Sequence, residues 1–205
     1  NIPKNVEHIG EKSFSECQNL EIVTFEKESH LLYIRPETFS FSRIRSITIP
    51  ASVIKIQSEA FKGCMCLSEV KFEKDANIIA IEQRAFFESS IEKITIPAKL
   101  EGICESAFEN CFRLHYVAFE KDSKLVIIGK RAFYSTAIEN IVIPKNVKNI
   151  YSEAFDSCQK LKSVIFEKGS TLKKIFSRSF RGCLIEEIFI PSSTDKIGHS
   201  AFEST

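Results

Sequence analysis

The segment Ile143–Lys168, I-P-K-N-V-K-N-I-Y-S-E-A-F-D-S-C-Q-K-L-K-S-V-I-F-E-K, decides the fold because the rest of the chain repeats it. Its opening Ile-Pro pair recurs every 47 residues (49 − 2 = 47), at Ile2-Pro3, Ile49-Pro50, Ile96-Pro97, Ile143-Pro144 and Ile190-Pro191. A fixed period of this length is typical of a solenoid, in which each repeat packs only on its neighbours. We therefore expect residues 1–205 to form a single solenoid. Because neither end carries a polar capping repeat, we expect it to be a piece of a longer array.

Each 47-residue unit contains two unequal half-repeats, and a small residue followed by Phe marks each of them. The step between marker phenylalanines alternates between 25 and 22 residues (39 − 14 = 25 and 61 − 39 = 22). The markers are Phe14, Phe39, Phe61, Phe86, Phe108, Phe133, Phe155, Phe180 and Phe202. Their constant position predicts a spine of buried rings along the solenoid, each stabilising the fold by about 1.5–3 kcal/mol through transfer from water.

Strands are predicted where one half-repeat reads L-x-x-V-x-F and the other reads I-x-x-I-x-I, because β-branched and aromatic residues alternate there. Eight such segments should stack in register as one parallel sheet. A proline follows every second segment and should end that strand, since it has no N–H to donate. Between the strands, the small-Phe-x-x-Cys segment has helical spacing but is too short for a stable helix, and we expect a single 3₁₀ or α turn.

This pattern resembles the BspA-like class of leucine-rich repeats, which is marked by I-P-x-x-V-x-x-I-x-x-x-A-F-x-x-C-x-x-L-x-x-V-x-F. Ile143–Phe166 matches it at every marked position. The double repeat closed by Phe-Glu-Lys, as at Phe166-Glu167-Lys168, is similar to expanded sets in protozoan parasites. The resemblance implies an α/β repeat fold rich in β structure: a right-handed leucine-rich-repeat solenoid with a parallel β-sheet on its concave face. Its convex face would carry short 3₁₀ or α turns and irregular segments.

The resemblance also implies a function without catalysis, because no catalytic residues come with this class. Its members are often displayed on microbial or parasite surfaces and are associated with adhesion to host matrix proteins, host cells or other microbes. We therefore predict a non-enzymatic protein-binding module of a cell-surface or secreted adhesin. The alternative is an intracellular leucine-rich-repeat scaffold or regulatory protein. Seven unpaired cysteines and the lack of an N-x-[ST] sequon favour that alternative.

Several other function classes find no support in the composition. The four histidines, His8, His30, His115 and His199, occupy different repeat positions, and no metal, phosphate-loop or hydrolase motif accompanies them. We therefore expect no metal, no cofactor and no enzyme activity. A net charge of +1 gives no argument for nucleic acid. No apolar run approaches the roughly 20 residues that span a bilayer, so we expect no membrane insertion in this segment.

Cysteines and charges recur at fixed repeat positions. Cys17, Cys64, Cys111, Cys158 and Cys183 share one position, where Ser or Thr stands in other half-repeats. This predicts a small buried site rather than disulfides, because thiols two rungs apart are about 9.6 Å distant. Cys158 and Cys183 are one rung apart, but their side chains should point the same way, which disfavours a bridge. Opposite charges before successive markers, as at Glu59 and Arg84, predict pairing between rungs. Glu26, Glu73, Glu120 and Glu167 should form a solvated edge, although an acidic row could also bind a basic partner.

Partner binding is predicted on the concave face, where one residue of each strand points outward. We expect this row to contain Thr24, Thr48, Lys71, Thr95, Ala118, Val142, Ile165 and Phe189, with Tyr116 in the neighbouring column. The row is polar at first and apolar later, and exposed contiguous apolar surface marks interaction sites. Two alternatives remain: the β-branched residues serve only strand propensity, or Ile165 and Phe189 lie under the loops of further rungs.

Overall fold

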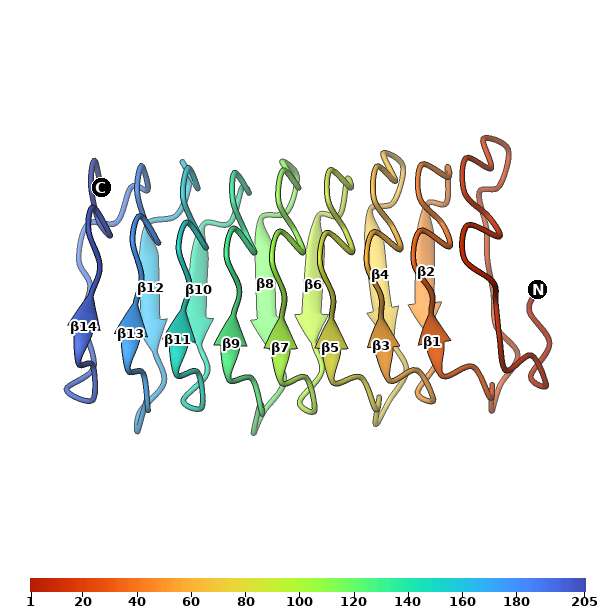
Figure 1. Cartoon of the computed structure of the whole chain (residues 1–205), viewed down its shortest axis with the longest axis horizontal. Helices are drawn as coiled ribbons and strands as arrows, with labels where there is room; N and C mark the ends of the chain where they lie inside the picture. The colour runs from red at the N-terminus through yellow and green to blue at the C-terminus, as the bar shows by residue number, and fades with distance from the viewer.

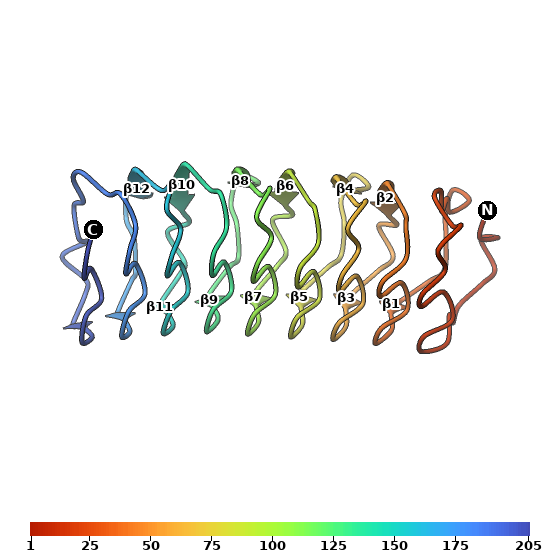
Figure 2. The ribbon, with the colours of Figure 1, turned by 90° about the horizontal axis from the view of Figure 1, so that it is seen from above.

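The structure, a computed structural model, describes residues 1–205 as a solenoid of stacked rungs. In Figure 1 the chain rises along the front, crosses over the upper turns, descends behind and shifts toward its C-terminal end, which makes the coil right-handed. Figure 2 shows the rungs stacked along a nearly straight axis with the two termini at opposite ends. Parallel strands line both broad faces, so the expected parallel solenoid is present, but it carries a second sheet that we did not expect.

One face carries the longer strands, and we call it the long-strand face. Two buried side chains alternate with two outward ones in β2, as they do in β6 and β10, which matches the predicted period of two. Three of these strands end at an Ile followed by Pro. The strands are β2 (Ser46–Ile49), β4 (Glu69–Phe72), β6 (Lys93–Ile96), β8 (Tyr116–Phe119), β10 (Asn140–Ile143) and β12 (Ser163–Phe166).

Six long strands form instead of the eight predicted, and they do not make one sheet. The order is β2-β4-β6-β8 in one sheet and β10-β12 in another. The outermost predicted segments contribute only isolated bridges, which are Ile2↔Phe25 and Ile22↔Ser46 in residues 20–25 and Ser163↔Glu187 in residues 185–190. Each bridge joins a single pair of residues, so neither segment forms a ladder of consecutive pairs.

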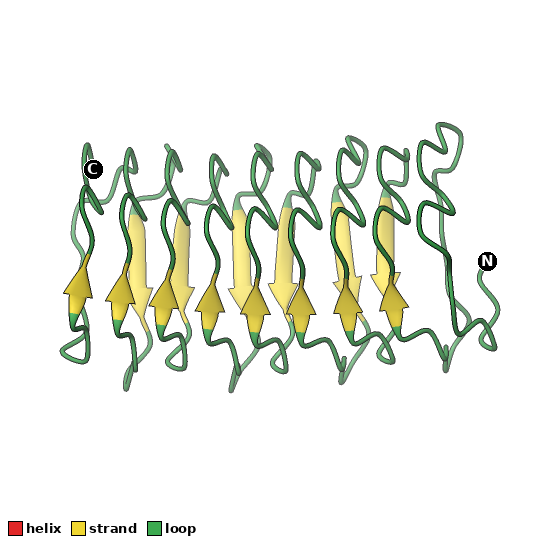
Figure 3. Ribbon diagram, in the orientation of Figure 1, coloured by secondary structure: helices red, strands yellow, loops and turns green.

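The opposite face, which we call the short-strand face, carries a continuous sheet of eight two-residue strands (Figure 3). Each strand has one outward residue followed by an Ile, and that Ile is buried in every strand except the last. Every neighbouring pair is parallel and in register. The strands are β1 (Tyr33–Ile34), β3 (Lys55–Ile56), β5 (Ala80–Ile81), β7 (Gly102–Ile103), β9 (Ile127–Ile128), β11 (Asn149–Ile150), β13 (Lys174–Ile175) and β14 (Lys196–Ile197).

The predicted 3₁₀ or α turns are not confirmed, and neither is the α/β class, because the structure contains no helix. In the turn around Phe61, Glu59 and Gly63 have φ values of 57° and 65° in the left-handed region. Positive φ at these positions breaks the helical run. As a result, the Phe61 N–H donates to the carbonyl of Ala85 in the next rung at 2.7 Å instead of to its own turn.

The predicted phenylalanine spine is confirmed. Nine marker rings stack in one column, with neighbouring centroids 5.1–5.3 Å apart. The seven inner rings are fully buried. The residue before each inner ring, such as Ala85 or Ala132, is also fully buried, which leaves room for the backbone of the next rung. The buried rings belong to one continuous core that also contains the buried residues of both faces, and the column contributes one ring to every rung.

The predicted buried site is confirmed for four of the five cysteines that share this repeat position, whereas Cys17 is only half-buried. All seven cysteines are free, and Cys64, Cys111, Cys158 and Cys183 are buried. The Cys111 thiol donates to the carbonyl of Phe86 at 3.0 Å, and Cys64 and Cys158 do the same to the marker Phe one rung earlier, at 3.1 Å. Burial raises the pKa of Cys111 to about 12. These thiols therefore stay protonated, and they act as structural hydrogen-bond donors.

Candidate protein-binding face

The outward row predicted as the binding site lies along the long-strand face. Thr48 stands directly opposite Lys71, Thr95 opposite Ala118, and Val142 opposite Ile165. All eight residues of the row are exposed except Ala118, which is half-buried. Because the array is nearly straight, this surface is flatter than the concave face we expected (Figure 2). Whether these residues bind a partner stays a prediction.

The apolar end of this row is well exposed. The exposed fractions of Val142, Ile165 and Phe189 are 48%, 56% and 77%. The bridge Ser163↔Glu187 places Phe189 beside Ile165, so the three side chains are contiguous across three rungs. Within residues 1–205, no loop covers Ile165 or Phe189. We call these three residues the apolar row.

The long strands pair two by two. We call the boundary between neighbouring long strands a junction, and a groove lies at every second junction, between one pair and the next. β2 and β4 pair over four residues, as do β6 and β8 and also β10 and β12. By contrast, β4 and β6 share only Glu69↔Lys93, and no pairing joins β8 to β10. Grooves of about 390 and 510 Å³ lie at these two open junctions, and a smaller one of about 280 Å³ lies at the junction before β2.

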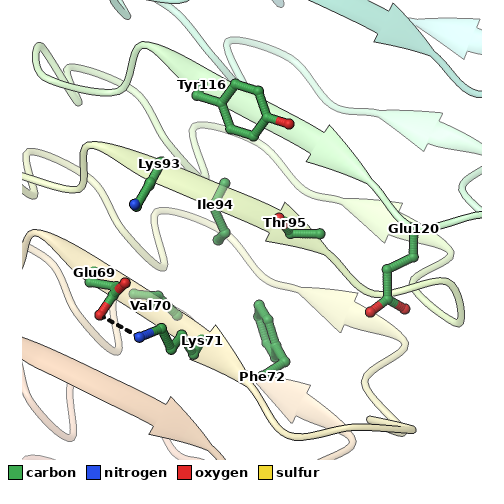
Figure 4. A pocket seen from close by; sticks show the side chains of 9 residues that line it. All are labelled: Glu69, Val70, Lys71, Phe72, Lys93, Ile94, Thr95, Tyr116 and Glu120. Atoms are coloured by element: carbon green, nitrogen blue, oxygen red, sulfur yellow. Dashed lines mark ion pairs between the residues drawn. The ribbon is translucent and has the colours of Figure 1, made fainter.

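The groove between β4 and β6 shows which side chains form the walls of such a groove (Figure 4). The Phe72 ring forms one wall, and Thr95 lies on the next strand. Lys71 forms an ion pair with Glu69 at 2.9 Å, which holds the ammonium group along β4. Tyr116 from β8 closes the upper end, and this residue is 53% exposed.

The larger groove, between β8 and β10, connects to the apolar row. Tyr116 and Phe119 come from one side, and Val142 comes from the other. His115 and Glu139 stand at its upper end, so the groove combines an apolar floor with a polar rim. Protein-binding surfaces commonly have this arrangement, in which apolar anchors are desolvated and polar groups surround them.

The Phe-Glu-Lys glutamates have a structural role that the sequence analysis missed. The Glu120 carboxylate accepts the backbone N–H of Ala98 at 2.9 Å, and Glu73 accepts that of Ala51 at 2.8 Å. Glu26 and Glu167 do the same for Lys4 and Lys145. Each carboxylate therefore fastens the turn after Ile-Pro to the following strand. We call these four residues the clamp glutamates. Three of them, all but Glu73, are exposed, as expected for an edge.

The charge pairing predicted for the turns is present in part. Arg84 lies 3.6 Å from Glu59, and Arg131 lies 3.1 Å from Glu153. Arg131 also reaches Glu109 at 3.1 Å, a partner that the repeat pattern had not indicated. Arg178 forms no ion pair, so the pattern is not continuous. These contacts support the register of the turns and converge on no cavity.

No group of three or more His, Cys, Asp or Glu side chains is placed to hold a metal ion. The structure contains no helix that is long and apolar enough to span a bilayer. Groove-wall residues such as Phe72 and Phe119 were not predicted as site residues, because their place in the repeat indicates only a core position. The signal was present in the unequal steps of 25 and 22 residues, which distinguish the two kinds of junction.

Comparison with known proteins gives a family match over the whole chain. A model described as the BspA type leucine rich repeat region matches residues 1–115 and 79–205, with six copies. No curated protein sequence matches the chain.

Similar folds occur among solved bacterial structures. The pneumococcal vaccine antigen PcpA is 35% identical, with a TM-score of 0.62 over 70% of this chain and 36% of PcpA. A leucine-rich repeat protein from Eubacterium ventriosum is 20% identical, with a TM-score of 0.75 over 99% of this chain and 57% of that protein. One from Bacteroides ovatus is 22% identical, with a TM-score of 0.56 over 99% and 75%. The chain therefore spans less than two thirds of the first two proteins.

Proposed function

Because the chain belongs to the BspA-type leucine-rich repeat family, we propose that it is a non-enzymatic protein-binding module of a cell-surface or secreted adhesin. Proteins of this fold typically act by binding and not by catalysis. The similarity to a pneumococcal vaccine antigen supports a place on a cell surface. The partners would be host matrix or host-cell proteins, or proteins of other microbes.

The observation that carries this proposal is the contiguous apolar row beside a groove. Val142, Ile165 and Phe189 are each about half exposed or more, and Tyr116 stands at the neighbouring groove. Contiguous exposed apolar side chains with a polar rim are the usual anchors of protein partners. The rigid array repeats such grooves at every second rung, so several weak contacts would act together as one multivalent site.

The test is to measure binding of the chain to a panel of extracellular-matrix proteins and to intact host cells at physiological salt. The test variant is Val142→Ser, Ile165→Ser and Phe189→Ser combined, and it should lose at least about tenfold in affinity. The matched control is Met65→Ser, Phe112→Ser and Leu184→Ser, which removes three side chains of similar exposure at the upper turns.

Saturable binding that only the first variant loses supports the long-strand face as the site. Equal loss in both variants would contradict it, and so would binding that the first variant keeps. Circular dichroism and urea unfolding of both variants confirm that each is folded.

A second candidate function is an intracellular scaffold or regulatory protein. Seven free cysteines favour it, because free thiols persist in reducing compartments. Labelling intact cells with a membrane-impermeant reagent distinguishes the two candidates. Labelled protein supports the adhesin, and label that appears only after lysis supports the scaffold.

A further inference from the structure

Four exposed lysines cluster at the C-terminal end of the short-strand face, on the side opposite the apolar row. Lys174 in β13 is the direct register partner of Lys196 in β14. The backbone N–H groups of Lys173 and Lys174 donate to the carbonyl of Lys148 at 2.8 and 3.2 Å. Lys148, Lys173, Lys174 and Lys196 therefore lie on three consecutive rungs, and we call them the lysine cluster.

The positive charge of this cluster is largely unbalanced. Lys173 lies 3.6 Å from Asp195, and the other three lysines form no ion pair. Elsewhere on the same face Lys55 is the only lysine in β1, β3, β5, β7 or β9, and it pairs with Glu82 at 3.5 Å. Like charges directly opposite each other on neighbouring strands destabilise a sheet. An anionic partner would relieve this repulsion.

The sequence as a whole also carries its excess positive charge in the C-terminal part, where the lysine cluster lies. Residues 145–205 contain ten Lys or Arg and seven Asp or Glu, a net charge of +3. The remaining residues contain 28 − 10 = 18 basic and 27 − 7 = 20 acidic side chains, a net charge of −2. The near-neutral total therefore hides a basic C-terminal third.

We propose that the lysine cluster binds a linear sulfated polysaccharide, laid across β11, β13 and β14. All four cations are lysines, which act as point charges and do not require the planar geometry that arginine recognises. Rungs about 4.8 Å apart present the ammonium groups at a density that matches a highly charged chain.

Nucleic acid fits this surface less well, because no free aromatic ring offers a base a stacking surface. Tyr151 and Phe176, which follow β11 and β13, are half-buried and stack on each other with centroids 4.7 Å apart. Single-stranded nucleic acid is usually held by stacking on exposed rings. The lysine cluster lies on a different face from the proposed protein-binding site, so an experiment can contradict one of the two proposals without contradicting the other.

The test uses heparin as the probe and measures affinity by calorimetry at 0.05 and 0.15 M NaCl. The cluster variant combines Lys148→Gln, Lys174→Gln and Lys196→Gln. Its matched control combines Lys27→Gln, Lys74→Gln and Lys121→Gln, three exposed lysines that also form no ion pair. We expect wild-type affinity to fall with salt, and the cluster variant to lose about tenfold or more at 0.15 M NaCl. The control should stay within about twofold of the wild type.

Equal weakening in both variants would overturn the proposal, and so would no heparin binding at 0.05 M NaCl. Tighter binding of duplex DNA or polyglutamate than of heparin would overturn the polysaccharide as the partner. Lys174→Glu separates binding from folding, because the new carboxylate faces Lys196. This variant should have a higher urea midpoint than the wild type and a lower affinity for heparin. A Lys174→Glu variant that keeps full affinity would also count against the proposal.

Discussion

The two faces of the solenoid are built from the same rungs but are held together differently. On the short-strand face, eight strands pair without interruption, although each contributes only two residues. On the long-strand face, strands of four residues pair in twos, and the junctions between pairs are open. Longer strands therefore do not make the more continuous sheet. The short-strand sheet and the phenylalanine spine set the stacking, which leaves the long-strand face free to form grooves.

The clamp glutamates explain part of this difference. Each one closes a junction within a 47-residue unit, by accepting an N–H from the turn after Ile-Pro. No carboxylate makes such a bond between the end of a Phe-type strand and the next Ile-type strand, where the Asn146 side chain instead donates to the carbonyl of Ser123 at 2.7 Å. The long strands thus occur as clamped pairs, and the grooves lie between the pairs.

The largest expected effect comes from breaking the spine that both faces share. Phe133 is fully buried between Phe108 and Phe155, so Phe133→Ala leaves a cavity in the middle of the stack. We expect the free energy of unfolding to fall by about 3–5 kcal/mol in urea melts. Phe112→Ala, at a residue that is 66% exposed, is the matched control and should cost less than about 1 kcal/mol. A loss below about 1 kcal/mol for Phe133→Ala would contradict the role of the spine.

An intermediate effect is expected from crowding the short-strand face. A Cβ at Gly129 would lie 2.7 Å from the carbonyl oxygen of Ile103, and backbone cannot easily move away. Gly129→Ala should therefore reduce the free energy of unfolding by about 2 kcal/mol. A Cβ at Gly102 meets nothing within 4 Å, so Gly102→Ala should change stability by no more than about 0.5 kcal/mol. Urea melts of the two variants compare them directly, and equal stability would mean that the rungs are less tightly packed here.

The smallest effect is expected from opening one clamped pair on the long-strand face. Glu120→Ala removes the acceptor for the Ala98 N–H and should cost about 1 kcal/mol. Hydrogen exchange gives the sharper measurement, because the Ala98 amide should exchange faster while the short-strand amides stay protected. Lys121→Ala, next to the clamp, is the control. Unchanged exchange at Ala98 would show that the clamp does not hold this junction closed.

Most of the buried positions could be predicted from the sequence, because the same residue pattern recurs at the same place in many half-repeats. The spine from Phe14 to Phe202 and the cysteine position are predicted correctly for this reason, as are the long strands that end before Pro50, Pro97 and Pro144. Nine examples of one repeat position, seven of them fully buried, leave little ambiguity about which side chains face inward.

Other features escaped prediction because they depend on contacts between rungs. A two-residue strand such as Ala80–Ile81 is too short to show a period of two, so the second sheet was missed. The turn at Glu59 looked helical because its positive φ is carried by an ordinary residue and not by glycine. The glutamate clamp depends on a backbone N–H from the preceding rung, 22 residues earlier, which no local pattern indicates.

Alternation of two unlike junctions also limits how such a gene can change in length. Loss or gain of a whole 47-residue unit would keep the alternation of paired and open junctions, and the marker rings could restack. Loss of 22 or 25 residues would place two half-repeats of one kind side by side, and a clamp glutamate would then face no Ile-Pro turn. Unequal recombination should therefore yield stable proteins mainly in steps of 47 residues, and the length of the array can vary while its local contacts do not.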